Sequence, residues 1–288
     1  MHQGTYTALV TPFKEGGIDF DAYAGLVERQ IEAGVQGIVP AGCTGEAATL
    51  SHDEQLKLIS FAVECAKGRV QVIAGTGSNN TAEAIHLTEK AGTLNIDGVL
   101  VISPYYNKPT QKGLFAHYSQ LADASKAPVM IYNVPGRTGV KIDAETIADL
   151  SKHPNIQSVK EACGSIDQVS DILNLCDIDV LSGDDGLTLP MMSVGAKGVV
   201  SVSSNLVPKE VSTMVQCAAD MDYASARKAH NDLLNLHKSM FVESNPIPVK
   251  AVLSEMGLIQ NELRLPLEIA TAETVAMARE LIKTYGLK

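Results

Sequence analysis

The sequence predicts an α/β fold, namely a (β/α)8 TIM barrel followed by a C-terminal helical appendage. Eight short runs rich in Val and Ile alternate with longer amphipathic stretches. Each run is almost continuously apolar, which is typical of parallel strands that are buried on both faces. The runs cover residues 7–10, 38–40, 70–74, 99–102, 129–131, 156–159, 178–181 and 199–202. Eight such units over about 220 residues match the usual size of this barrel.

Helix start signals separate the apolar runs. Residues 51–54 and 165–168 both fit a capping box, in which a Ser and a Glu or Gln three residues later satisfy free backbone N–H groups. Pro208 suits the first position of a helix. A helical stripe follows the first of these signals, at Leu56, Ile59 and Val63. A doubly wound sheet is the competing architecture, but the sequence has no Gly-rich dinucleotide fingerprint.

The strand-like runs stop at about residue 221. The segments 222–241, 246–256 and 268–285 that follow have helical patterns only. We therefore expect a catalytic barrel over residues 1–221 and a C-terminal helical region over residues 222–288. Because no Pro-, Gly- or Ser-rich linker separates them, we expect the helical region to pack on the barrel.

Composition excludes several functional classes. The 288 residues are 45% hydrophobic, with 23 Lys and Arg against 33 Asp and Glu, a net charge of −10 and a pI near 5.2. This balance argues against nucleic-acid and anionic-membrane partners, which require basic surfaces. The five cysteines have no C-x-x-C spacing and no metal-binding histidine pattern is present, so we expect reduced thiols and no metal. Without a signal peptide or a long apolar run, the expected location is cytoplasmic.

Lys160 directly follows the sixth apolar run, at the strand end where a barrel carries its chemistry. An ordinary lysine, with a pKa near 10.4, is a free amine in roughly one molecule in a few thousand at neutral pH. A nucleophilic role therefore requires burial or a nearby cation, which would lower its pKa to about 7 to 8 at roughly 4 kcal/mol of differential solvation. The alternative is a strand-end lysine whose amine extends to solvent.

Other polar and aromatic residues follow neighbouring runs and are expected at the same barrel mouth. The glycine turn at 42–46 offers backbone N–H groups and a hydroxyl to an anion. Each of these residues alone has an ordinary structural explanation, in packing or in a plain surface loop. Their convergence on one barrel mouth, together with Lys160, nevertheless indicates a functional site. The residues are Cys43 and Thr44, Tyr105 and Tyr106, Tyr132 and Arg137, and residues 183–185.

Six segments resemble the dihydrodipicolinate synthase family, within the pyruvate-dependent class I aldolase and lyase superfamily, and the resemblance covers the whole chain. The segments are 42–46, 103–109, 132–139, 159–162, 182–185 and 245–250. The resemblance implies that Lys160 forms a Schiff base with pyruvate, without any cofactor. The resulting enamine attacks L-aspartate 4-semialdehyde and gives 4-hydroxy-2,3,4,5-tetrahydrodipicolinate in lysine (diaminopimelate) biosynthesis.

The resemblance also implies roles for individual residues. Tyr132 relays protons, Tyr106 enters the site of a neighbouring subunit, and Arg137 holds the semialdehyde carboxylate. Substrate binding is further assigned to Thr44, which contacts pyruvate, and to Gly183 and Val200. The implied assembly is a homotetramer, a dimer of tight dimers.

Cys43 departs from the family pattern, in which a threonine links the two tyrosines of the proton relay. A thiol is a weaker hydrogen-bonding group than a hydroxyl. We therefore expect a relay that is slower, that runs through water or that is open to oxidation. Alternatively, Cys43 is only a small packing group.

A second set of residues resembles the feedback site for L-lysine at the tight-dimer interface of the family. Gln55 stands where sensitive members often carry histidine, and helix capping explains part of the set equally well. The residues are Ala48, His52, Gln55, Asn79, Glu83 and Tyr105.

The sequence leaves two other functions open. One is a lyase for N-acetylneuraminate or a sugar acid on the same fold, and the other is a silent barrel that senses a keto acid.

Overall fold

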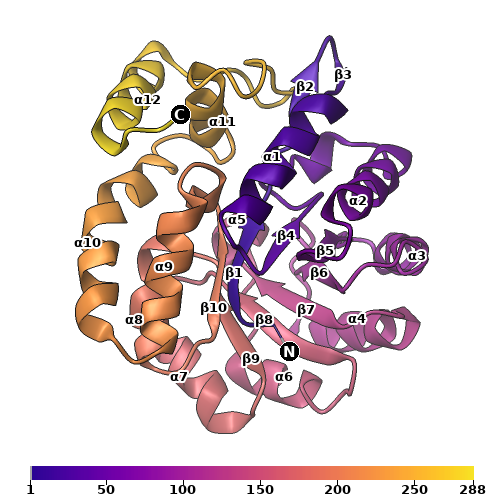
Figure 1. The fold of residues 1–288 in the computed structure, drawn as a ribbon. Coiled ribbons are helices and arrows are strands. Elements are labelled where there is room, and N and C mark those ends of the chain that lie inside the picture. Colours follow the sequence, from indigo (N-terminus) through magenta and orange to yellow (C-terminus); the bar gives the residue numbers. More distant parts are fainter. Residues whose placement is uncertain (1) are drawn as a thin grey trace.

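The computed structural model describes residues 2–288, and eight parallel strands of this range form a closed barrel (Figure 1). The strands neighbour one another in the order β1-β10-β9-β8-β7-β6-β5-β4. Their bounds are β1 Gly4–Ala8, β4 Gly37–Val39, β5 Gln71–Gly75, β6 Gly98–Ile102, β7 Val129–Asn133, β8 Ile156–Glu161, β9 Asp179–Ser182 and β10 Gly198–Ser201. The predicted (β/α)8 barrel is thus confirmed, and the doubly wound sheet was the wrong alternative.

Helices surround the barrel and connect its strands (Figure 1). The α-helices of the barrel are α1 Phe20–Glu32, α2 His52–Ala66, α3 Thr81–Ala91, α4 Gln111–Ala124, α5 Pro135–Thr138, α6 Ala144–Leu150, α7 Ile166–Leu175, α8 Thr188–Ser193 and α9 Pro208–Ala219. Three 3₁₀ turns, η1 Ala47–Thr49, η2 Asp185–Leu187 and η3 Ser203–Asn205, follow strands at the mouth. Because parallel strands end on one side, these connections all deliver residues to one rim.

The predicted start of α2 is confirmed, whereas that of α7 is only half right. Ser51 and Glu54 form the complete capping box. At α7 the Ser165 hydroxyl accepts from the Gln168 N–H, but the Gln168 side chain donates to the Ile142 carbonyl instead of closing the box. The buried face of α2 also differs from the predicted apolar stripe. Ile59 is buried as expected, but Leu56 and Val63 are only partly buried.

The C-terminal helices are α10 Tyr223–Ser239, α11 Ile247–Glu255 and α12 Ala272–Tyr285. They lie on the barrel, where α10 packs against α9 (Figure 1). The loop after α11 reaches a small hairpin, β2 Phe13–Lys14 and β3 Gly17–Ile18, that the sequence pattern did not predict. Gly16 of this hairpin bonds with both Glu262 and Arg264. The division of the chain at residue 221 stays a prediction.

The barrel interior is filled by its own apolar cluster. It consists of Tyr6, Ala8, Val39, Ile73, Leu100, Met130, Tyr132, Val134, Leu181 and Val200, with Cys43, Ile102 and Ala162 packed against it. Three of the predicted site residues, Tyr132, Val200 and Cys43, therefore belong to this cluster. Part of the site is therefore built into the packed interior of the barrel.

Candidate active site

Lys160 is held inside the barrel by its strand. It is the fifth residue of β8 and pairs in register with Tyr132 of β7. Only 5% of its surface is exposed, and its Nζ atom lies 4.1 Å from the centroid of the Tyr132 ring. The lysine does not extend to solvent, so the plain strand-end alternative is wrong.

The surroundings of Lys160 favour the neutral amine. Burial lowers its pKa to about 8, because a charged amine loses its hydration inside the barrel. The Cys43 thiol and the Asp185 carboxylate act in the opposite direction, whereas the Arg137 guanidinium lowers the pKa further. At pH 7 such a group is a free amine in about a tenth of the molecules, roughly 200 times more often than an ordinary lysine.

Tyr132 supplies a buried phenol beside this amine. The residue is 6% exposed, and burial raises the pKa of its hydroxyl well above the usual range. Arg137 opposes this rise, but burial dominates. The phenol therefore keeps its proton at neutral pH and can both donate and accept hydrogen bonds.

Gly183 lies directly after β9 and leaves the space that the Lys160 side chain occupies. A Cβ atom at this position would lie 2.9 Å from Lys160 Cε and 2.8 Å from Ala162 Cβ, closer than real Cβ contacts allow. Val200, on β10, is completely buried in the barrel interior. Gly183 thus shapes the site through its missing side chain.

The turn after β4 carries Cys43 and Thr44 toward the mouth. Cys43 is half-buried, whereas Thr44 is 3% exposed and its Oγ1 accepts a hydrogen bond of 2.9 Å from Asn245 Nδ2. Glu46 ends the turn with a φ of 54°, a left-handed conformation that side chains rarely adopt. This turn therefore needs support from outside the barrel.

That support is a buried ion pair that sequence reasoning missed. Lys250 Nζ lies 2.6 Å from Glu46 Oε1, and both side chains are fully buried. Lys250 also donates to the Thr11 carbonyl and lies 4.4 Å from the centre of the Phe13 ring. One signal was available, since a lysine within the apolar segment Ile247–Glu255 must find a partner once that helix is buried.

Arg137 lies on the short helix α5 directly after β7. Its Nη2 donates to the backbone carbonyl of Asn245 over 3.2 Å, and its guanidinium remains exposed. Asn245 is buried, and together with Lys250 it shows that the C-terminal region contributes to the mouth. A planar guanidinium suits a carboxylate because it can bind both oxygens at once.

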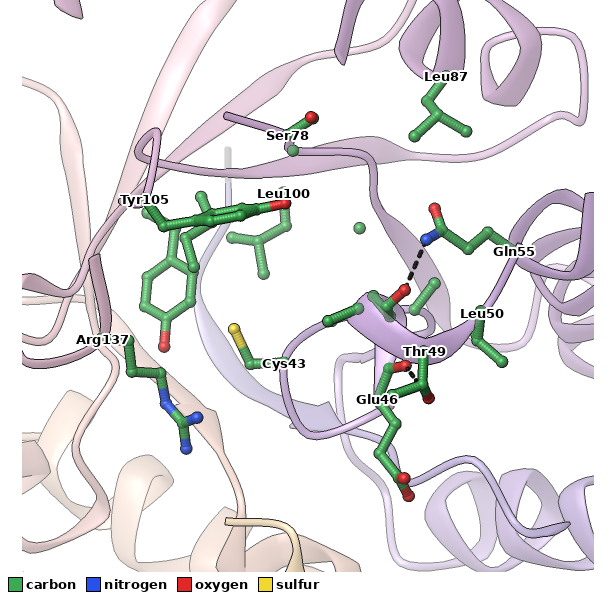
Figure 2. Close-up of a pocket in the computed structure, with 18 of the residues that line it drawn as sticks. Cys43, Glu46, Thr49, Leu50, Gln55, Ser78, Leu87, Leu100, Tyr105 and Arg137 are labelled. Carbon is green, nitrogen blue, oxygen red and sulfur yellow. Dashed lines mark hydrogen bonds between the residues drawn. The ribbon is translucent and has the colours of Figure 1, made fainter. Parts of the chain in front are cut away.

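A cavity of about 480 Å³ joins most of the predicted residues (Figure 2). Cys43 and Arg137 lie on one side, and Gln55 and Leu87 lie on the other. Gln55 Nε2 donates to the Ala47 carbonyl over 2.8 Å. The predicted residues in its wall are Cys43, Tyr132 and Arg137 from the catalytic set, and Ala48, His52, Gln55, Glu83 and Tyr105 from the second set.

Six predicted residues lie outside this wall, namely Lys160, Thr44, Gly183, Val200, Asn79 and Tyr106. Asn79 donates to the Tyr105 carbonyl over 3.2 Å and so fixes the loop after β6. Tyr106 is 89% exposed and has a φ of 72°. Its ring leaves its own barrel, so within residues 2–288 it does not meet Tyr132 in the same subunit.

Within residues 2–288, no group of three or more His, Cys, Asp or Glu side chains is arranged to hold a metal ion. No helix in the described part of the chain has the length and apolar character needed to cross a membrane. All five cysteines are free.

Comparisons with known proteins agree over the full length. The 4-hydroxy-tetrahydrodipicolinate synthase of Citrifermentans bemidjiense is 51% identical and is covered completely, as is this chain. The dihydrodipicolinate synthase of Acinetobacter baumannii complexed with pyruvate has a TM-score of 0.97 at 42% identity, with 99% of each chain covered. That of Cyanidioschyzon merolae with lysine bound has a TM-score of 0.96 at 40% identity, again with 99% coverage of both. Since the model of the dihydrodipicolinate synthetase family matches residues 1–285, the chain belongs to that family.

Proposed function

We propose that Lys160 is the nucleophile with which this lyase condenses pyruvate with L-aspartate 4-semialdehyde. The product is 4-hydroxy-2,3,4,5-tetrahydrodipicolinate, in lysine (diaminopimelate) biosynthesis, and one water is released. The observation that carries this assignment is the buried amine of Lys160, with a pKa of about 8, beside the Tyr132 ring. Lys250 is a poor alternative, because Glu46 holds its amine as an ion pair.

The reaction begins when the Lys160 amine attacks the keto carbon of pyruvate and water leaves. The resulting iminium withdraws electrons, so the methyl group loses a proton and an enamine forms without a metal or other cofactor. The enamine carbon then bonds to the aldehyde carbon of the second substrate. Finally, the amino group of that substrate attacks the iminium carbon and displaces Lys160, which closes the ring.

Proton transfer in these steps is assigned to a relay of three residues. Tyr132 and Cys43 come from the subunit that holds Lys160, and Tyr106 of the partner subunit is the third member. The protonated phenol of Tyr132 lies against the amine and suits this role. The exposure of Tyr106 supports its insertion into a neighbouring subunit, because a phenol is apolar enough to be buried in an interface. We infer a homotetramer, built as a dimer of tight dimers.

Substrate carboxylates are assigned to two different groups. The exposed guanidinium of Arg137 suits the carboxylate of the semialdehyde, and the Thr44 hydroxyl suits that of pyruvate. Gly183 and Val200 complete the substrate pocket through their shape. A lyase for N-acetylneuraminate or sugar acids would use the same Schiff base, so a coupled assay that compares aspartate semialdehyde with N-acetylmannosamine tests the choice of aldehyde.

We also propose that L-lysine binds the part of the cavity lined by His52, Glu83 and Tyr105. These residues line one continuous cavity with Tyr132, and the relative from Cyanidioschyzon merolae has lysine bound. The set is completed by Ala48, Gln55 and Asn79. Calorimetric titration with L-lysine tests this site. Glu83→Gln should weaken any binding, since it removes the negative charge that an ammonium group requires.

Reduction with borohydride in the presence of pyruvate tests the central assignment. The parent should gain the mass of one reduced pyruvate on the peptide that contains Lys160, and Lys160→Ala should gain none while it keeps its fold. An adduct of undiminished yield on the variant, or one mapped to Lys250, would contradict the assignment. The same experiment excludes a silent keto-acid sensor if the adduct forms.

A further inference from the structure

Asn245 bonds to both of the residues assigned to substrate carboxylates. It lies between α10 and α11, is 5% exposed and lines the cavity. Its side-chain Nδ2 donates to Thr44 Oγ1 over 2.9 Å, and its backbone carbonyl accepts from Arg137 Nη2 over 3.2 Å. One residue of the C-terminal region therefore links the turn after β4 to the helix after β7.

The direction of the bond to Thr44 has a chemical consequence. A threonine hydroxyl has one hydrogen to donate and two lone pairs that accept. The Asn245 amide nitrogen can only donate, so it occupies a lone pair of Thr44 and cannot take the hydroxyl hydrogen. Among residues 2–288, this is the one side-chain hydrogen bond that reaches Thr44 Oγ1. The hydrogen of Thr44 therefore stays available for a substrate.

Packing alone does not explain an asparagine at this position. Its Oδ1 is buried without a hydrogen-bond partner in the described chain. An unpaired buried acceptor is unfavourable, and an apolar side chain of similar size would avoid it. The carboxamide is thus retained although only its nitrogen is satisfied.

We propose that Asn245 is a positioning residue that keeps the Thr44 hydroxyl as a donor toward the pyruvate carboxylate. The inference rests on the proposed function, in which Thr44 contacts pyruvate. Asn245 selects the first substrate indirectly, because it fixes which way a hydroxyl points. Its backbone bond to Arg137 does not depend on its side chain, so substitutions at Asn245 leave that contact in place.

Asn245→Asp tests the proposal because it keeps the shape and replaces the donor with an acceptor. The Thr44 hydroxyl would then donate to the aspartate instead of to pyruvate. We expect the KM for pyruvate to rise roughly 10- to 100-fold, the range for a lost hydrogen bond to a charged group. Asn245→Leu removes the donor but offers no acceptor, so its KM should rise less. A packing role predicts the opposite order, since leucine differs more in shape.

The same substitution in a Thr44→Val background isolates the hydroxyl. There Asn245→Asp should raise the KM for pyruvate much less than it does in the parent, because only the repulsion between the two carboxylates remains when no hydroxyl is left to reverse. An equal effect in both backgrounds would overturn the proposal, as would a leucine variant worse than the aspartate variant or a Thr44→Val variant with the parental KM. None of these results would contradict the assignment of Lys160 as the nucleophile. That assignment is tested separately by borohydride trapping and is wrong if no adduct forms at Lys160.

Discussion

Gly183 and Lys160 share one space at the carboxyl ends of β8 and β9. A Cβ atom on Gly183 would lie 2.9 Å from Lys160 Cε and 3.1 Å from Lys160 Cγ. The lysine stem is confined from the opposite side by the Tyr132 ring, over which its Nζ lies. The direction of the nucleophile is therefore set by the absence of a side chain on the neighbouring strand.

Gly183→Ala should displace the Lys160 side chain without unfolding the barrel. We expect the rate of pyruvate trapping to fall by at least about 10-fold, because an amine moved by even about 1 Å loses its alignment with the keto carbon. Rapid-quench borohydride trapping measures this rate. The matched control is Gly25→Ala on α1, where nothing lies within 4 Å of an added Cβ. Equal rates for both variants would show that Lys160 can relocate freely.

The rate of adduct formation should depend on pH through Lys160. Burial lowers its pKa to about 8, and only the deprotonated amine attacks. At low pyruvate concentration the trapping rate should thus rise about tenfold per pH unit below pH 8 and level off above it. A midpoint near 10.4, the value of an ordinary lysine, would contradict a buried nucleophile.

The barrel was predictable because its strands are buried on both faces. A continuous apolar run such as that of β7 or β10 is visible in sequence without any knowledge of its neighbours. The β2–β3 hairpin was not predictable, since strands of two residues have no period to detect. The run at 7–10 extends past the end of β1 for a related reason: Leu9 and Val10 are buried at the mouth although the strand ends at Ala8.

The residues of the candidate site likewise fall into those that the sequence pattern predicted and those that it did not. Lys160 and Tyr132 lie near the ends of β8 and β7, and Arg137 follows β7, so the position of each in the chain indicated its place in the barrel. Asn245 and Lys250 meet Thr44 and Glu46 across about 200 positions of sequence, and no local pattern reports such a pairing. The fold brings them together by closing the C-terminal helices over the mouth.

Arg137→Ala should impair the use of the semialdehyde much more than pyruvate trapping. Loss of a hydrogen-bonded charge contact of about 2 to 4 kcal/mol lowers the specificity constant for the semialdehyde roughly 30- to 1000-fold. Trapping should slow only slightly at pH 7, because Arg137 helps to lower the pKa of Lys160, and the difference should vanish at higher pH. Arg137→Lys keeps the charge but loses the planar fork, so it should be intermediate. Steady-state kinetics equal to the parent would reject the role.

Subunit mixing tests whether Tyr106 completes a neighbouring site. Tyr106→Phe and Lys160→Ala should each be inactive alone, because every site lacks one group. In a mixed dimer, however, one site combines an intact Lys160 with an intact Tyr106 of the partner subunit. Activity above that of both parents is expected after subunit exchange, which native mass spectrometry can verify. If verified mixed dimers stay inactive, Tyr106 does not act across the interface.

Cys43→Thr should preserve or raise turnover and should remove sensitivity to oxidation. Cys43 packs against the cluster that contains Tyr132 and lines the cavity, as the proposed relay requires. A hydroxyl forms shorter and stronger hydrogen bonds than a thiol, and it cannot be oxidised to a sulfenic acid. Turnover before and after mild peroxide measures both effects.

Cys65→Ser, on α2, serves as the control, because its half-buried thiol does not line the cavity and its loss should leave the peroxide sensitivity unchanged. A different result is chemically meaningful. Sulfur is larger than oxygen, so a pocket adapted to the thiol would pack poorly around threonine. A parent that resists peroxide together with a much slower threonine variant would show that Cys43 is a fitted part of this site. The relay would then have to run from Tyr132 without a strong hydrogen bond at position 43.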